Sequence, residues 1–183
     1  MIDMQNSYFE FPELGEVRDE LVASINELIH AAHDAGRPVV LVRTEHTRDR
    51  STWTLNMRED GEGFAYPGTE QAEFLDGLAT GGHVEVVKTR DSAFFETDLR
   101  AELDRLGVDH LLVCGVSTHS CVAQTAIDGF AENLHVAVAR DAISSDNSAL
   151  SEALLEFLED QMRQPLLDRV QSLELLRNGR WPD

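Results

Sequence analysis

The sequence predicts a single α/β domain, residues 1–183, with a mainly parallel central sheet between two layers of helices. Apolar runs of strand length alternate with amphipathic stretches of helical period along the whole chain. The strands expected from these runs are apolar on both faces, which is typical of parallel sheets that helices cover on each side. No repeat, linker or low-complexity segment divides the chain, and its length suits one domain with its own core.

Each expected element has a local signal. Residues 16–35 carry apolar side chains at helical spacing, and Gly36 ends this expected helix. The apolar run at residues 38–42 follows as a buried strand. The same alternation then predicts, in order, a strand at 83–87, a helix at 97–106, a strand at 109–114, a helix at 120–132, a strand at 135–139, a helix at 148–162 and a last strand at 170–175.

Residues 44–68 form a long irregular segment that is rich in Arg, Asp, Glu, Gly and Thr. Loops of this length in compact domains are usually functional or mobile, so we expect a lid or pocket wall. A disordered, solvated loop is the alternative. Five large apolar side chains argue for packing instead: Trp53, Leu55, Met57, Phe64 and Tyr66.

The formal charge of −19 disfavours nucleic acid and anionic membrane surfaces as partners, because phosphate binding depends on clustered Lys and Arg. No apolar stretch approaches the roughly 20 residues that a membrane span needs, and the N-terminus shows no positively charged signal sequence. We therefore expect a cytoplasmic protein that acts on a small molecule, with no nucleic-acid or membrane partner.

Lys88 is the only lysine, since 14 of the 15 basic residues are arginines. It directly follows the apolar run at residues 83–87, so a strand would deliver it to the edge of the sheet. Chemistry that needs a compact ammonium with a movable proton cannot use a guanidinium. Lys88 is therefore a candidate catalytic group, with an ordinary surface lysine as the alternative.

The two cysteines fit neither a disulfide framework nor a structural zinc site, which needs three or four ligands. Cys114 closes the apolar run at residues 111–114 and is expected to be a small buried packing residue. Cys121 starts the helix expected after the turn at residues 115–120, where it is either a nucleophile or a second packing residue.

Three strand ends bring Asp3, Lys88 and Cys121 to one edge, because the carboxyl ends of parallel strands lie on the same side. The helix dipole and a nearby ammonium would favour a thiolate at Cys121. Asp3 could accept the thiol proton and pass it to a leaving nitrogen, while amide N–H groups of residues 115–121 face the developing oxyanion. This combination predicts acyl transfer through a thioester. Taken alone, an Asp directly after an apolar strand is more often a turn or helix-cap residue, which is the alternative for Asp3.

Five segments around these positions share their sequence, in order, with one known family: Ile2 to Phe9, Lys88 to Phe94, Gly115 to Val122, Thr125-Ala126 and Asp141-Ala142. They resemble the isochorismatase-like cysteine hydrolases, and the match spans nearly the whole chain. The resemblance implies a three-layer α/β/α fold of Rossmann-like topology, a catalytic triad of Asp3, Lys88 and Cys121, and assembly as homodimers or homotetramers. It also implies a cis peptide between Val116 and Ser117, with backbone N–H groups of Ser117 and Cys121 forming the oxyanion hole.

The chain departs from the family pattern in two places. Family members usually have several apolar residues before the Ile-Asp pair, whereas only Met1 precedes it here. We expect either a start placed too late or a trimmed chain, or else a very short first strand that anchors Asp3 poorly. The nicotinamidase branch binds a divalent ion through an Asp-x-His pair and a further His, but the aligned positions here are Thr44, His46 and Phe64. We therefore expect no metal and no cofactor, which also weakens nicotinamide as the substrate.

A Cys-His pair is the rival mechanism, with His119 or His46 as the base for Cys121. We expect the substrate contacts to come from the long irregular segment and from the rim beside the nucleophile. These candidates are His46, Trp53, Phe64, Tyr66 and His119.

We expect a cofactor-independent hydrolase that cleaves a small C–N bond, in an amide, carbamoyl or ureido group, through a thioester on Cys121. A reactive cysteine favours this chemistry over vinyl-ether hydrolysis of isochorismate, which needs acid catalysis and no nucleophile. Isochorismate-type hydrolysis and a non-catalytic binding or scaffold role of the same fold are the alternatives.

Overall fold

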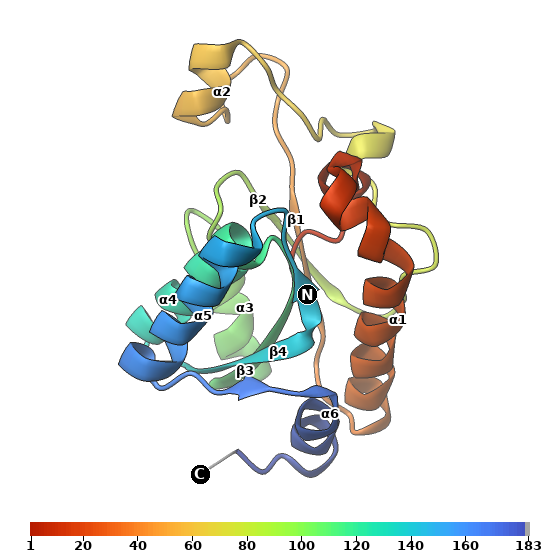
Figure 1. The fold of residues 1–183 in the computed structure, drawn as a ribbon, viewed down its shortest axis with the longest axis vertical. Coiled ribbons are helices and arrows are strands. Elements are labelled where there is room, and N and C mark those ends of the chain that lie inside the picture. Colours follow the sequence, from red (N-terminus) through yellow and green to blue (C-terminus); the bar gives the residue numbers. More distant parts are fainter. Residues whose placement is uncertain (182–183) are drawn as a thin grey trace.

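The computed structural model describes residues 1–181; residues 182 and 183 of the expected domain lie outside the described part. Its centre is a parallel sheet with helices on both faces, so the predicted α/β class is confirmed (Figure 1). β1 pairs with β2, and β3 pairs with β4, which pairs in turn with the short β5. The strands are β1 (Val40–Thr44), β2 (Val84–Lys88), β3 (His110–Val116), β4 (His135–Ser144) and β5 (Leu166–Leu167).

Ile2 joins the two halves of the sheet. It bridges Val42 of β1 on one side and Gly115 of β3 on the other, both in parallel orientation. Its N–H donates to the carbonyl of Cys114 at 2.9 Å, and its carbonyl accepts from the N–H of Val116 at 3.0 Å. The expected first strand is thus reduced to a single bridging residue, which places the N-terminus at the centre of the sheet (Figure 1).

Helices cover the two faces of the sheet with separate apolar cores. On one face, Leu21 and Ile25 of α1 pack in the same cluster as Val116 of β3. On the other face, Ala126 of α4 and Leu158 of α5 pack in a cluster with strand residues. The covering helices are α1 (Pro12–Asp34) and α6 (Arg169–Asn178) on the first face, and α3 (Leu99–Leu106), α4 (Ala123–Ala131) and α5 (Ser148–Met162) on the second.

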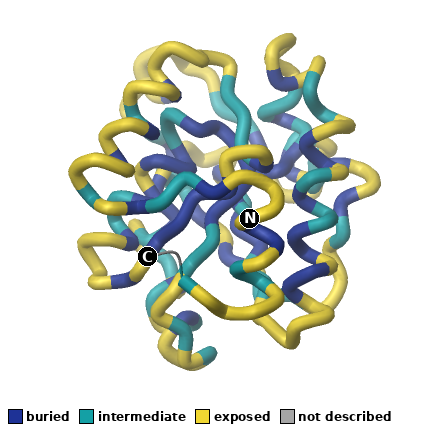
Figure 2. The backbone as a smooth tube through the Cα atoms, turned by 60° about the horizontal axis from the view of Figure 1, so that its bottom comes forward, coloured by how far each residue is buried: buried dark blue, intermediate teal, exposed yellow. Residues whose placement is uncertain are grey.

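The burial of the backbone follows this layering. The buried stretches run through the strands and the inward sides of the helices, and the exposed turns lie at the periphery (Figure 2). Within residues 1–181, no helix combines the length and apolarity needed to cross a membrane.

One secondary-structure prediction was wrong, and one confirmed helix starts earlier than expected. Residues 170–175 belong to helix α6, because Asp168 and Gln171 form a capping box that starts a helix there. The helix expected at 120–132 begins earlier, with a π-helical turn (Thr118–Val122) that continues into α4. The sequence signal for α6 was present in the Asp-x-x-Gln spacing, and the apolar run outweighed it in the prediction.

The connection between β1 and β2, residues 45–83, is called the excursion here. It rises above the carboxyl edge of the sheet and then returns alongside α1 to the start of β2 (Figure 1). It contains α2 (Leu55–Asp60) and a short 3₁₀ helix (Glu70–Ala72). Trp53 is buried, and its indole N–H donates to the carbonyl of Thr47 at 2.9 Å. A Cβ on Gly63 would lie 2.3 Å from the Trp53 ring and 2.2 Å from the Tyr66 hydroxyl, so the chain packs closely on itself here.

Candidate active site

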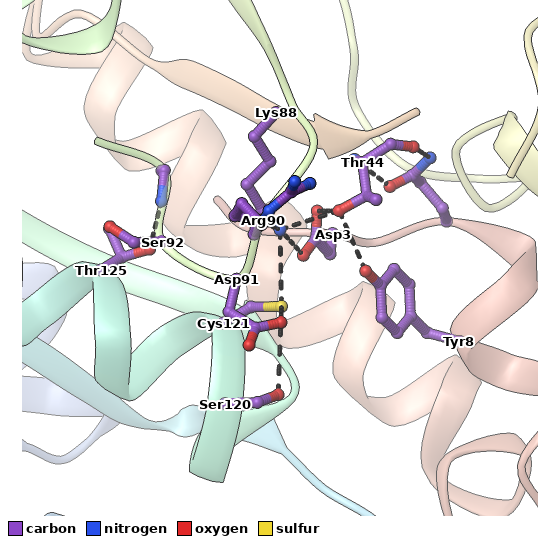
Figure 3. Close-up of polar contacts among 12 residues, drawn as sticks. Asp3, Tyr8, Thr44, Lys88, Arg90, Asp91, Ser92, Ser120, Cys121 and Thr125 are labelled. Atoms are coloured by element: carbon purple, nitrogen blue, oxygen red, sulfur yellow. Dashed lines mark hydrogen bonds and ion pairs between the residues drawn. The ribbon is translucent and has the colours of Figure 1, made fainter. Parts of the chain in front are cut away.

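The ammonium of Lys88 lies at the centre of a buried polar cluster (Figure 3). Its Nζ is 2.7 Å from Oδ2 of Asp3 and 3.5 Å from Sγ of Cys121, and it donates to Oγ1 of Thr44 at 2.8 Å. Asp3, Lys88 and Cys121 each expose at most 2% of their surface. The sequence predicted that the side chains of Asp3, Lys88 and Cys121 lie at one edge of the sheet. In the structure, Asp3 and Cys121 both contact the ammonium of Lys88.

The positions of these groups follow from the sheet. Lys88 is the last residue of β2 and pairs in register with Thr44, the last residue of β1. Asp3 directly follows the bridging residue Ile2, and Cys121 lies in the turn that leaves β3. Parallel strands that end together thus place a carboxylate, a hydroxyl, an ammonium and a thiol on the same side.

Asp3 is held from its backbone as well as from its side chain. Its N–H donates to the carbonyl of Val42 at 2.9 Å, and its carbonyl accepts from Gln5 at 2.8 Å. Its φ of 50° lies in the left-handed region, which residues other than glycine rarely adopt. The expectation that a very short first strand would anchor Asp3 poorly was therefore wrong, because the neighbouring strands supply the missing contacts.

Sequence reasoning missed the residues that organise the cluster. The hydroxyl of Thr44 accepts from Lys88 and from Tyr8 at 3.0 Å, and it donates to Oδ1 of Asp3 at 3.1 Å. The side chain of Gln5 accepts from the N–H of Thr44 at 2.7 Å and donates to its carbonyl at 2.9 Å. Thr44 carries the same signal as Lys88, a polar residue at the end of an apolar strand, and Gln5 and Tyr8 belong to the N-terminal segment already singled out.

The turn that carries Cys121 begins at a cis peptide bond between Val116 and Ser117, the geometry that the resemblance implies. The carbonyl of Ser117 accepts from the N–H groups of Ser120 at 3.1 Å and Val122 at 3.2 Å. Within residues 1–181, no hydrogen bond from the N–H of Ser117 is found. The N–H of Ser117 is one of the two donors that the resemblance implies for the oxyanion hole.

The electrostatics of the cluster favour a neutral thiol and a charged amine. Burial raises the pKa of Cys121, the charge of Asp3 raises it further, and the ammonium of Lys88 opposes both. Burial by itself would lower the pKa of Lys88, but Asp3 and then Cys121 outweigh it, so the pKa of Lys88 is raised. The ammonium of Lys88 thus lowers the pKa of the thiol as expected, but burial and the neighbouring carboxylate, which the sequence did not reveal, raise it more.

Two of the predicted substrate contacts lie beside the cluster. The ring of Phe64 lies 5.3 Å from the ring of His46 and stands edge-on to Tyr8 at 5.9 Å. Nδ1 of His46 lies 3.1 Å from the carbonyl of Thr52, which can only accept, so this nitrogen carries a proton. Burial lowers the pKa of His46, which makes it a neutral ring at neutral pH.

The other three candidates contact different parts of the molecule. Trp53 is bound within the excursion, and the guanidinium of Arg48 covers the ring of Tyr66 at 4.4 Å. The imidazole of His119 hydrogen-bonds the hydroxyl of Ser145. Across the described residues, neither His119 nor His46 hydrogen-bonds Cys121, so the geometry does not favour a Cys-His pair.

No group of three or more His, Cys, Asp or Glu side chains within residues 1–181 could hold a metal ion. Two cavities of about 360 Å³ lie at the amino ends of the strands, the edge opposite Lys88. One is lined by Val40 and Leu111 and the other by His135 and Met162, so both are separate from the cluster around Cys121.

The chain is similar to known proteins in both sequence and structure. A family model, the isochorismatase domain, matches residues 1–169. The solved structure of an isochorismatase family protein from Desulfovibrio vulgaris is 31% identical, with a TM-score of 0.81, and the match covers 93% of this chain and 92% of that chain.

Two relatives with more specific descriptions match most of the sequence. A protein from Arabidopsis thaliana described as a "probable inactive nicotinamidase" is 33% identical over 154 residues, 79% of each chain. A maleamate amidohydrolase from Pseudomonas putida is 28% identical over 189 residues, 97% of this chain and 85% of that one.

Proposed function

Since this chain belongs to the isochorismatase family of hydrolases, we propose that it cleaves the C–N bond of a small amide, carbamoyl or ureido substrate through a thioester on Cys121. The observation that carries the proposal is the contact of one ammonium, Lys88, with the carboxylate of Asp3 and the sulfur of Cys121 in a buried site. A nucleophile and a proton acceptor on either side of one cation are the parts that acyl transfer needs.

Attack and proton transfer occur together in this scheme, because the thiol of Cys121 is neutral before substrate binds. The bond from Sγ to the substrate carbonyl carbon forms as the thiol proton passes to Asp3. Lys88 keeps its proton, since its pKa is raised, and it acts as a fixed positive charge beside both partners. The histidines take no part in this step.

The tetrahedral intermediate then collapses. Its oxyanion is held by the N–H groups of Ser117 and Cys121, while Asp3 returns the proton to the leaving nitrogen and the C–N bond breaks. Water attacks the resulting thioester with Asp3 as the base, and the thiol is restored as the acid product leaves. The net reaction consumes one water and yields an acid and ammonia or an amine.

Ammonia release from a panel of small amides, ureas and N-carbamoyl compounds tests the proposal. We expect turnover of at least one compound by the wild type, loss of at least about a thousandfold in Cys121→Ala, and little change in Cys114→Ala. Intact-protein mass spectrometry should detect an acyl adduct on the wild type alone. Absence of turnover across the panel would contradict the proposal.

The roles of the basic residues are separated by a second pair of variants. Lys88→Ala should reduce turnover strongly, because it removes the charge beside Asp3 and Cys121, whereas His119→Ala should change mainly KM. The opposite pattern would support the Cys-His mechanism. Vinyl-ether hydrolysis is distinguished by Cys121→Ala, which that reaction should tolerate because it needs no nucleophile.

A non-catalytic role is the second candidate, because the Arabidopsis relative bears the description of an inactive enzyme. A binding or scaffold protein has no use for a thiol, a carboxylate and an ammonium in contact, which favours the hydrolase. Equal binding of a candidate ligand by the wild type and Cys121→Ala, with no turnover by either, would favour the scaffold.

A further inference from the structure

A second carboxylate lies against the sulfur of Cys121. Oδ1 of Asp91 is 3.8 Å from Sγ (Figure 3). Its Oδ2 accepts a hydrogen bond from Nε2 of Gln124 at 2.9 Å. Asp91 is exposed, whereas Asp3 is fully buried on the other side of the cluster. The two acidic groups therefore differ in position: one lies inside the site and the other at its open side.

The backbone around Asp91 is fixed against α4. The N–H of Ala93 donates to the hydroxyl of Thr125 at 3.0 Å, and Gln124, the neighbour of Thr125, holds the Asp91 carboxylate. Two consecutive residues of α4 thus position the segment that follows β2. The Asp91 carboxylate therefore has a fixed position relative to a substrate that binds at Cys121.

The charge of Asp91 is not matched by a nearby cation. Over residues 1–181, no ion pair within 4.0 Å is formed by Asp91, and the neighbouring Arg90 directs Nη1 to the carbonyls of Thr52 and Thr89 at 2.7 and 2.6 Å. Lys88 is occupied by Asp3. Among the described residues, Asp91 therefore presents a carboxylate without a salt-bridge partner on the exposed side of Cys121.

We propose that Asp91 is a specificity-determining residue that selects neutral or cationic substrates and rejects those with a carboxylate next to the scissile group. The inference rests on the proposed amide hydrolysis and narrows its substrate class. An N–H group or ammonium beside the scissile carbonyl would hydrogen-bond Asp91, whereas a carboxylate there would meet a like charge. The maleamate amidohydrolase among the relatives is described as acting on a carboxylate-bearing amide, and this chain should act poorly on such a compound.

Three amides that differ in the group on the carbon beside the scissile carbonyl test the inference: malonamate, malonamide and glycinamide. We expect kcat/KM of the wild type to rise from the anion to the neutral amide to the cation. Asp91→Asn should reduce the cation-to-anion ratio by about tenfold, a modest factor because water screens an exposed carboxylate. The ratio is the informative quantity, since any effect of the lost charge on thiol reactivity changes all three rates together.

Glu20→Gln is the matched control, because it removes one negative charge from the exposed side of α1, remote from the site. It should leave the ratio unchanged. An unchanged ratio in Asp91→Asn would overturn the inference, as would an equal loss on all three amides, which would mean that Asp91 transfers a proton or supports the structure instead.

Alkylation gives a readout that does not require turnover. In a Cys114→Ala background, the rates of modification of Cys121 by neutral iodoacetamide and anionic iodoacetate are compared at pH 9. The neutral reagent should be favoured, and adding Asp91→Asn should reduce that preference by several-fold. If the wild type turns over none of the amides while Asp91→Asn still shifts the alkylation ratio, the proposed function fails and the charge selection stands. An unchanged alkylation ratio refutes the selection regardless of turnover.

Discussion

Thr44 and Lys88 are register partners at the ends of adjacent parallel strands, and the ammonium of Lys88 donates a hydrogen bond to the hydroxyl of Thr44 at 2.8 Å. The same hydroxyl accepts from Tyr8 and donates to Asp3. A hydroxyl has one donor and two acceptor sites, so its capacity is fully used. One buried oxygen thereby links the amine, the phenol and the carboxylate of the cluster.

Thr44→Val should therefore weaken both stability and turnover. The substitution keeps the shape of the side chain but leaves buried donors on Lys88 and Tyr8 without their acceptor. We expect a loss of about 1–3 kcal/mol in the free energy of unfolding, measured by urea denaturation, and a fall of at least about tenfold in kcat. Tyr8→Phe removes one of these bonds only and should cost about 1 kcal/mol. Equal stability of Thr44→Val and the wild type would show that the hydrogen bonds of the Thr44 hydroxyl do not stabilise the fold.

The pKa of Cys121 predicts a loss of stability in alkali. Burial and Asp3 raise the folded pKa above the unfolded value of about 8.5, so the unfolded chain releases the thiol proton first as the pH rises. Stability is full below the unfolded pKa and decreases above it. Burial raises the pKa of Cys114 in the same direction, so both cysteines contribute.

Urea denaturation at pH 7.5 and 9.5 measures this effect. The loss between the two pH values should be smaller in Cys121→Ala and in Cys114→Ala than in the wild type. The alkylation rate of Cys121 should also keep rising through pH 9, because the thiol is still protonated there. A plateau in that rate near neutral pH would mean that the thiolate is already formed and that the assigned direction is wrong.

The buried ring of His46 predicts the opposite dependence in acid. Burial lowers its folded pKa below the unfolded value of about 6.5, so the unfolded chain binds a proton first as the pH falls. Stability should therefore decrease between pH 7 and pH 5. His46→Gln should reduce that decrease, whereas His30→Gln, at an exposed position of α1, should leave it unchanged. Identical acid dependence in the wild type and His46→Gln would exclude this contribution.

Gly115 should not tolerate a side chain. Its φ is +115°, and a Cβ would lie 2.0 Å from the carbonyl oxygen of Ile2, the residue that joins the two halves of the sheet. The contacted oxygen belongs to the backbone, so it cannot move aside cheaply. We expect Gly115→Ala to lower the free energy of unfolding by at least about 3 kcal/mol or to prevent folding.

Gly36→Ala is the matched control for that prediction. Gly36 has a φ of +64° but no atom within 4 Å of its Cβ position, so only the conformational cost of about 1 kcal/mol remains. A thermal unfolding curve of each variant separates the two costs. Similar melting temperatures for both variants would show that the contact with Ile2 does not add to the destabilisation.

Prediction from the sequence succeeded where a local pattern was sufficient. The apolar run before Lys88 and the turn before Cys121 placed both residues at strand ends, and parallel order then brought the ends together. It was incomplete for Thr44 and Asp91, because their importance depends on contacts with residues far away in the chain. It was wrong for residues 170–175, where an apolar run was given more weight than the capping pair Asp168 and Gln171.

The sequence by itself determined the class of fold and the edge at which chemistry is concentrated, because hydrophobic periodicity and the order of elements are local properties. Only the tertiary structure decided in which direction the pKa of Cys121 is shifted and which charged groups lie beside its sulfur. Both depend on how deeply the sulfur is buried and on its distances to Asp3, Lys88 and Asp91. Those distances are fixed by strand register and helix packing. Both result from many contacts between segments that are far apart in the sequence.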